Sequence, residues 1–349
     1  MDSFLGESLK LPQNKTISLE EGALEALEGR KNLLAFSAGV DSTALYHLLK
    51  EEGIDFDIAL VNYKTRIQSD EEMHYARKLA DQDGKTAHIL EYPLKGSDFE
   101  SQARKVRYDF FGSLIGEYGY ENLITAHQLD DLLEWGLMQL CKGCGVAEFA
   151  GMEPLQKREN YTLVRPLLFI PKAELEKYLK AKDIRYFVDE SNLQTHHTRN
   201  LFRHEAAAFL MKSCPNGIAR SFRYMIEDKK TLLPNPKIIF HNGDLVCFDR
   251  PESETTAIRQ IDKLLKERGY LLSGAQKREI SRQKSAVVGG KWVVVIEEKD
   301  IWICPYVQAT MPKEFKERCR KAKIPKTVRP YLFKTDSLER LLSTPFFSS

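Results

Sequence analysis

Two short polar clusters in this chain of 349 residues have residue types and spacing suited to chemistry. The first is Ser37–Ser42, where small residues follow an apolar run and precede a helical pattern. Small residues let the backbone turn sharply, and the N–H groups at a helix start attract phosphate oxygens. The segment lacks both the lysine of GxxxxGK[ST] and the spacing of GxGxxG. It is therefore a candidate phosphate-binding turn, with a plain strand-to-helix connection as the alternative.

The second cluster is Ala126–Asp131, which places a histidine beside two adjacent aspartates at the start of a predicted helix containing Glu134. Carboxylates next to an imidazole can hold Mg²⁺, orient an amine or move protons. Acidic residues in a first helical turn also stabilise the helix through its dipole. A helix-start role is therefore the alternative for this cluster.

Alternating strand and helix patterns in the first two hundred residues would position both clusters. The predicted strands are Leu33–Phe36, Phe56–Val61, Thr86–Leu90 and Asn122–Ala126. One predicted helix starts at Thr43. Four others cover Ser69–Asp83, Phe99–Tyr118, Asp130–Leu140 and Pro171–Lys182. Such alternation predicts an α/β fold with a doubly wound parallel sheet, whose ligands bind beyond the carboxyl ends of the strands. Ser37–Ser42, Asn62–Arg66 and Ala126–Asp131 all follow predicted strands, so we expect them to converge.

The remainder of the chain has an α+β texture. A further strand is expected at Ile184–Val188, and Leu232–Pro236 reads as a linker or turn. Beyond it we predict strands at Lys237–Phe240, Leu245–Phe248, Trp292–Glu297 and Ile301–Pro305, and helices at Glu254–Arg268 and Pro312–Lys323. The expected domains are a lead segment, 1–20, a catalytic domain, 21–212, and a basic α+β region of one or two subdomains, 213–349.

Charge is unevenly distributed along the chain, although the net charge is only +2. Residues 1–205 hold 25 Lys and Arg against 34 Asp and Glu, and residues 206–349 hold 27 against 16. A polyanionic partner for the basic half is one interpretation, and a solvated basic surface is the other. The chain has no apolar run of about 18 residues for a membrane span and no signal-peptide pattern at its start.

The six cysteines of this long chain do not resemble a disulfide framework, so we expect no disulfide partner and a cytoplasmic location. Cys141 and Cys144 form a lone CxxC, short of the four ligands that a structural zinc ion needs. Incidental substitution in a turn is the simpler interpretation of that pair.

The segment Ser-Ala-Gly-Val-Asp-Ser at 37–42 resembles the SGGxDS signature of the PP-loop ATP pyrophosphatases, with Ala38 at the second glycine. Further blocks resemble the bacterial tRNA(Ile)-lysidine synthetase family in order along the chain. They are VNYKTR at 61–66, ESQARKVRY at 100–108, TAHQLDDLLE at 125–134, KGCG at 142–145, RPLL at 165–168, DESN at 189–192 and AKIPKTVR at 322–329. The match is specific over about 33–205 and weak over 260–335. Asn62, Tyr63 and Leu132 depart from the family pattern.

The resemblance implies a PP-loop domain, similar to the adenine nucleotide alpha hydrolases, that uses ATP and Mg²⁺. It implies ligation of L-lysine to C2 of the wobble cytidine, position 34, in the CAU anticodon of isoleucine tRNA. The cytidine would first be adenylated with release of pyrophosphate, and the lysine amine would then displace AMP, changing codon reading from AUG to AUA. Lysine and the tRNA would be the partners, with no membrane involved.

The resemblance also implies roles for particular residues, and the chemistry of the side chains supports some of these roles. ATP would bind Ser37, Ala38, Gly39, Val40, Asp41 and Ser42. Catalytic roles would fall to Asp41, His127 and Asp131, with Asp41 either a Mg²⁺ ligand or the group that orients the amine. Substrate-binding residues would be Asp130, Asp131, Glu134, Arg104, Arg107, Arg199, Asn200 and Arg203. Acidic side chains favour the lysine cation, and arginine forks match phosphate geometry; surface ion pairs are the alternative for the arginines.

Two other function classes remain open. One is a different PP-loop enzyme, either a small-molecule amide ligase or a tRNA sulfur transferase. The ligase would leave the basic region unexplained, and the sulfur transferase should depend on Cys141 or Cys144. The other is a non-catalytic RNA-binding relative, indicated by Ala38, Asn62 and Tyr63, which would bind tRNA without releasing pyrophosphate.

Overall fold

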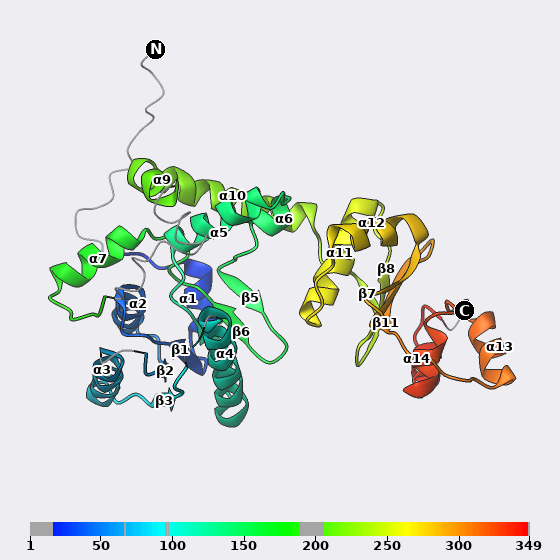
Figure 1. Ribbon diagram of the computed structural model, residues 1–349, viewed down its shortest axis with the longest axis horizontal. Coiled ribbons are helices and arrows are strands. Elements are labelled where there is room, and N and C mark those ends of the chain that lie inside the picture. The colour runs from blue at the N-terminus through cyan, green and yellow to red at the C-terminus, as the bar shows by residue number, and fades with distance from the viewer. Residues whose placement is uncertain (1–16, 66–67, 95, 97, 189–205, 348–349) are drawn as a thin grey trace, which may run out of the picture. The chain divides into compact units, whose positions relative to one another are not determined.

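The protein is described by a computed structural model that covers residues 17–65, 68–94, 96, 98–188 and 206–347 (Figure 1). The chain divides into two compact units, Met1–Glu227 and Asp228–Ser349. This division lies later than the boundary expected at 212/213. The reason is helix α10 (Pro215–Leu232), which buries Phe222 and Ile226 in an apolar cluster of the first unit. Most of the expected lead segment, 1–20, lies outside the described residues.

A six-stranded sheet forms the centre of the first unit, in the order β3-β2-β1-β4-β6-β5. Its strands are β1 (Asn32–Ala35), β2 (Asp57–Asn62), β3 (Ala87–Glu91), β4 (Asn122–Ile124), β5 (Leu155–Lys157) and β6 (Thr162–Val164). All neighbours pair in parallel except β5 and β6, which form an antiparallel hairpin. The predicted doubly wound parallel sheet is confirmed, and the hairpin was not predicted because each of its strands has only three residues.

Helices cover both faces of this sheet. The helices of the first unit are α1 (Glu21–Leu27), α2 (Val40–Glu51), α3 (Gln68–Gln82), α4 (Phe99–Tyr118), α5 (Leu129–Cys141), α6 (Val146–Phe149), α7 (Lys172–Ala181), α9 (Ala208–Ser213) and α10. Of these, α9 and α10 pack with α5 in a cluster that contains no strand residue. Successive residues of β1 enter different cores, since Leu33 packs with Phe111 of α4 and Leu34 packs with Leu45 of α2. Burial on both faces explains why this strand is a continuous apolar run.

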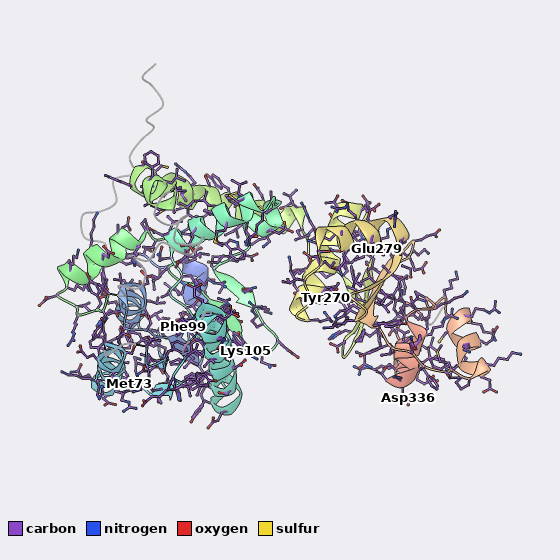
Figure 2. The ribbon with its side chains drawn as sticks, viewed as in Figure 1. Met73, Phe99, Lys105, Tyr270, Glu279 and Asp336 are labelled. Carbon is purple, nitrogen blue, oxygen red and sulfur yellow. The ribbon has the colours of Figure 1, made fainter. Side chains whose placement is uncertain are left out.

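The second unit contains a five-stranded antiparallel sheet in the order β7-β8-β11-β10-β9. Its elements are β7 (Ile238–Asn242), β8 (Leu245–Asp249), α11 (Glu254–Glu267), α12 (Gly274–Gln283), β9 (Ser285–Val288), β10 (Trp292–Ile296), β11 (Asp300–Pro305), α13 (Lys313–Lys321), α14 (Arg329–Lys334) and α15 (Leu338–Leu342). One face packs against α11 and α12, and the other against α13, α14 and α15. In Figure 2, Tyr270 and Glu279 mark the first side and Asp336 the second. The predicted α+β texture is confirmed.

No helix among the described residues combines the length and apolar character needed to cross a bilayer. All six cysteines carry free thiols, and Cys247, Cys304 and Cys319 are buried in the second unit.

Candidate active site

The strand order brings the carboxyl ends of three predicted strands to one edge of the sheet. Strand β1 lies between β2 and β4, with Leu34 level with Ile58 on one side and Ile124 on the other. From β1 the chain winds outward through β2 and β3, and then returns to the opposite side through β4. Ligands of open parallel sheets bind at such a reversal. The predicted convergence of the polar segments that follow β1, β2 and β4 is confirmed.

The turn after β1 has the backbone of a phosphate-binding loop. Ala38 has a φ of 59°, in the left-handed region, and its side chain is fully buried. Gly39 is extended and precedes α2, whose first intrahelical bond runs from Thr43 N–H to the carbonyl of Gly39 at 2.9 Å. The first N–H groups of an α-helix point out of its N-terminal end, and α2 begins at Val40, directly after this turn. These groups and the positive end of the helix dipole make the start of α2 a candidate anion site at the carboxyl edge.

Ser42 stabilises this turn from within. Its hydroxyl accepts a hydrogen bond from Ser37 N–H at 3.2 Å, lies 3.0 Å from Ser37 Oγ and donates to the carbonyl of Gly39 at 3.2 Å. The side chain is only 4% exposed. Ser42 therefore shapes the loop with its hydroxyl, and its backbone N–H is the group available to a phosphate.

The second wall of the site is the start of α5, where a capping box fixes the acidic cluster. Gln128 precedes the helix and its side chain accepts a hydrogen bond from Asp130 N–H at 2.5 Å. Asp131 Oδ2 in turn accepts the N–H of Gln128 at 3.3 Å. Beside it, His127 Nδ1 lies 2.9 Å from Thr125 Oγ1. Asp131 therefore does stabilise the helix start, as the alternative interpretation of this cluster predicted. His127 and Asp131 are half-buried, and they follow β4 at the same edge of the sheet as Ser37–Ser42.

The other two acids of α5 turn inward. Asp130 Oδ2 accepts the backbone N–H of Lys172 at 3.0 Å, at the first residue of α7. Burial raises the pKa of Asp130, and the hydrogen bond from Lys172 opposes that rise. Glu134 follows one turn later and is only 2% exposed. The predicted cluster therefore separates into an edge pair, His127 and Asp131, and an inner pair, Asp130 and Glu134.

Two of the residues that depart from the family pattern, Asn62 and Tyr63, lie at the end of β2. Asn62 is buried and bridges its turn, donating to Asp70 Oδ1 at 2.8 Å and accepting Lys64 N–H at 2.8 Å. Tyr63 donates its hydroxyl to the carbonyl of Ala103 at 2.6 Å, which ties β2 to α4. Both residues make structural bonds here, so neither adds a metal ligand or a proton carrier.

Helix α4 brings arginines toward this strand end. Phe99, labelled with Lys105 on α4 in Figure 2, packs edge-on against the Tyr63 ring at 5.6 Å. Burial raises the pKa of Tyr63, and the nearby charge of Arg107 lowers it. Arg104 is exposed and lies over the ring of Tyr108 at 4.9 Å. Of the two predicted arginines on α4, Arg107 is the one whose charge acts on Tyr63 at the end of β2.

Three residues that sequence reasoning did not select also build the site. Arg165 is buried and donates to the carbonyl of Glu153 at 2.8 Å, and burial lowers its pKa to about 10. Its position as the first residue of the RPLL block could have indicated from the sequence that Arg165 matters. Thr125 orients His127, and its position two residues earlier was the only clue. Phe187 N–H donates to the carbonyl of Ala38 at 2.9 Å, a bridge that no local pattern marks.

The strand expected at Ile184–Val188 is therefore reduced to that single bridge between Phe187 and Gly39. The predicted substrate residues Arg199, Asn200 and Arg203 lie outside the described residues. Within the described ranges, no group of three or more His, Cys, Asp or Glu side chains is arranged to hold a metal ion.

Comparisons with known proteins agree with this geometry. A PP-loop domain model matches residues 13–210. The tRNA(Ile)-lysidine synthase of Campylobacter jejuni is 43% identical over 318 residues, covering 91% of this chain and 97% of that protein. That of Helicobacter pylori is 42% identical, covering 89% and 91%, and that of Wolinella succinogenes is 43% identical, covering 91% and 97%.

Among solved structures, a U34-tRNA thiolase from Methanococcus maripaludis is similar with 19% identity and a TM-score of 0.48, covering 58% of this chain and 74% of that one. We draw nothing about activity from so distant a likeness. The curated relatives match nearly from end to end, and the PP-loop model spans the sheet, the phosphate turn and the wall of α5. The chain therefore belongs to the tRNA(Ile)-lysidine synthase family of PP-loop proteins.

Proposed function

We propose that this protein ligates L-lysine to C2 of the wobble cytidine in the CAU anticodon of isoleucine tRNA, with ATP as the energy source. The observation that carries the proposal is the shared edge of two walls: the phosphate turn after β1 and the acid–imidazole wall after β4. The family identity supplies the substrates, because the relatives that match over most of this chain are named for this reaction.

The reaction has two balanced steps. The O2 atom of the cytidine attacks the α-phosphorus of ATP, so that a P–O bond forms and the bond to the pyrophosphate leaving group breaks. The ε-amine of lysine then attacks C2, a C–N bond forms, the C–O bond to AMP breaks and the amine loses a proton. The modified base pairs with A in place of G, which changes codon reading from AUG to AUA.

In the first step, the start of α2 holds the phosphates. The backbone N–H groups of residues 40–42 and the helix dipole supply positive potential without a lysine in the loop. Mg²⁺ usually binds proteins through one or two carboxylates and takes its other ligands from phosphates and water. Asp41, in the first turn of α2, would supply one such carboxylate, and the ion would offset part of the negative charge of the phosphates.

In the second step, the wall of α5 handles the lysine. The carboxylate of Asp131 attracts the ε-ammonium group, and buried Glu134 adds negative charge one turn further along the same helix. We assign to His127, whose ring Thr125 orients, the proton that the ammonium group must lose before it attacks. The alternative role of Asp41, in place of binding Mg²⁺, is to orient this amine together with Asp131 and His127.

The basic second unit provides a surface for tRNA. Exposed lysines lie on and just after α13, namely Lys313, Lys316, Lys321, Lys323 and Lys326. Phe315 of the same helix packs against Phe333 of α14 with ring centres 5.0 Å apart. Lysines suit RNA phosphates and aromatic rings suit unstacked bases. In the first unit Arg104 and Arg107, with Arg199, Asn200 and Arg203, are assigned to the nucleotides near the reacting cytidine.

One assay tests this function. The protein is incubated with ATP, labelled lysine and total tRNA, and label is measured in the RNA. Since Asp41 would act on the phosphates or on the amine, we expect Asp41→Ala to lower incorporation by about 100-fold or more. Asp81→Ala, which removes an exposed acid of α3, serves as the matched control and should behave like the wild type.

The other function classes give different results in the same assay. Incorporation should survive Cys141→Ser and Cys144→Ser, whereas a sulfur transferase would depend on one of these thiols. Pyrophosphate release without labelled RNA would point to another PP-loop ligase. Binding of tRNA with neither label nor pyrophosphate would identify a non-catalytic relative. Either of these last two results, or loss of incorporation in Cys141→Ser or Cys144→Ser, would overturn the proposal.

A further inference from the structure

Helix α7 and its flanking residues, 170–187, connect the two walls of the site. At their start, Lys172 N–H donates to Asp130 Oδ2 at 3.0 Å, and the carbonyl of Ile170 accepts Leu129 N–H at 3.0 Å. At their end, Phe187 N–H donates to the carbonyl of Ala38 at 2.9 Å. We call residues 170–187 the α7 strut. One segment is therefore hydrogen-bonded to the start of α5 and to the ATP loop.

Between its two ends, the strut is held by buried side chains and further hydrogen bonds. Leu175 and Leu179 are fully buried in the same apolar core as the inner face of α2. Tyr178 donates its hydroxyl to Glu51 Oε1 at 2.5 Å, at the last residue of α2. After the helix, Ile184 N–H returns to the carbonyl of Leu179 at 3.0 Å, which sets the direction of the chain toward Phe187.

We propose that Asp130 is a positioning residue that anchors the α7 strut and, through the strut, sets the ATP loop against the wall of α5. This inference rests on the proposed function and revises the substrate-binding role that the resemblance implied for Asp130, which then holds α7 instead. The first N–H groups of a helix have no intrahelical partner, and a carboxylate at that position is a strong acceptor near the positive end of the dipole. Asp131 and Glu134 remain for the ammonium group.

The hydrogen bond can be removed from either side by a single substitution. Asp130→Ala removes the acceptor, whereas Asp130→Asn keeps an oxygen that can accept the same N–H. Lys172→Pro removes the donor, and proline is favoured at the first helical position. Pro171 already has φ −63° and ψ 141°, the extended conformation required before a proline. Lys172→Ala keeps the N–H and is the matched control for loss of the side chain.

The variants are compared as full-length proteins in ATP-binding titrations and in lysine incorporation with tRNA. Because small misplacements of reacting groups are costly, we expect Asp130→Ala and Lys172→Pro each to lower kcat by about tenfold or more. Both should weaken ATP binding and leave KM for lysine within about twofold of the wild type. The double variant should be no worse than the poorer single variant, because both changes remove one bond. Asp130→Asn and Lys172→Ala should retain most activity.

The opposite pattern would overturn the inference. If Lys172→Pro behaves like Lys172→Ala while Asp130→Ala or Asp130→Asn raises KM for lysine, Asp130 contacts the substrate directly. Should Asp130→Ala fail to fold, the comparison of Lys172→Pro with Lys172→Ala still decides the question. ATP binding is measured without lysine or tRNA, so it reports on the strut even if lysine proves not to be the co-substrate.

Discussion

The two compact units both build a sheet covered by helices on both faces, but they differ in strand direction. In the first unit, parallel strands place the carboxyl ends of β1, β2 and β4 and the starts of α2 and α5 at one edge. In the second unit the strands are antiparallel, so successive strand ends alternate between the two edges. Helix starts and polar turns are therefore gathered at one sheet edge in the first unit only. The second unit contributes surface charge instead, as its excess of basic residues shows.

The strongest test of this division reverses charge in the second unit. Lys313 and Lys316 are exposed in the first turn of α13, where acidic residues stabilise a helix through its dipole. The pair Lys313→Glu and Lys316→Glu should therefore fold normally while losing phosphate contacts. We expect tRNA binding to weaken by about tenfold or more and its salt dependence to become shallower. ATP binding in the absence of tRNA should not change.

Lys291→Glu is the control, because Lys291 is also exposed in the second unit but lies in the turn between β9 and β10. Equal losses for Lys291→Glu and the α13 pair would mean that general charge, and not the α13 surface, attracts the tRNA. Unchanged binding for both would remove the second unit from tRNA recognition altogether.

A smaller effect is expected at the junction between α5 and α10, which decides where the first unit ends. A Cβ on Gly136 would lie 2.9 Å from Phe222 Cζ and 3.1 Å from Phe149 Cζ, two rings that stack at 5.4 Å. Overpacking costs about 1–3 kcal/mol, partly offset by the helix propensity of alanine, about 1 kcal/mol. Gly136→Ala should lower the free energy of unfolding of the first unit by about 1 kcal/mol in urea titration.

Gly112→Ala on α4 is the matched control, because a Cβ there meets nothing within 4 Å. This variant should be as stable as the wild type or slightly more stable. If Gly136→Ala behaves in the same way, α10 does not pack on α5 as described and the boundary at Glu227 is wrong.

The smallest effect is expected for Ala38→Gly, at the position where the chain departs from the SGGxDS signature. A left-handed backbone costs a non-glycine residue about 1–2 kcal/mol, and burial of a methyl group returns about 0.8 kcal/mol. The two terms nearly cancel, so lysine incorporation by Ala38→Gly should stay within about twofold of the wild type. Ala38→Val places a β-branched residue at a positive φ inside the core and should lose most activity. A large loss in Ala38→Gly would contradict the loop geometry.

Elements with strong local patterns were predictable from the sequence. The helix Phe99–Tyr118 was predicted with the bounds that the structure shows, because its apolar residues recur at helical spacing and Gly119 ends it with a φ of 71°. Helix α10 was not among the predicted helices, because Pro215 and Gly217 interrupt the local helical pattern. In the structure Pro215 is instead the first residue of a helix, where proline needs no N–H partner.

The sequence by itself determined the family of this protein and placed two candidate clusters, a phosphate turn and an acid–imidazole cluster, in order along the family pattern. Only the tertiary structure separated Asp130 from Asp131, two adjacent residues of the same type. Neighbouring side chains at a helix start point in different directions, so their partners come from different parts of the fold. Asp131 bonds within its own turn, whereas Asp130 bonds to Lys172, 42 residues further along the chain. A local sequence pattern holds no information about a partner so far along the chain.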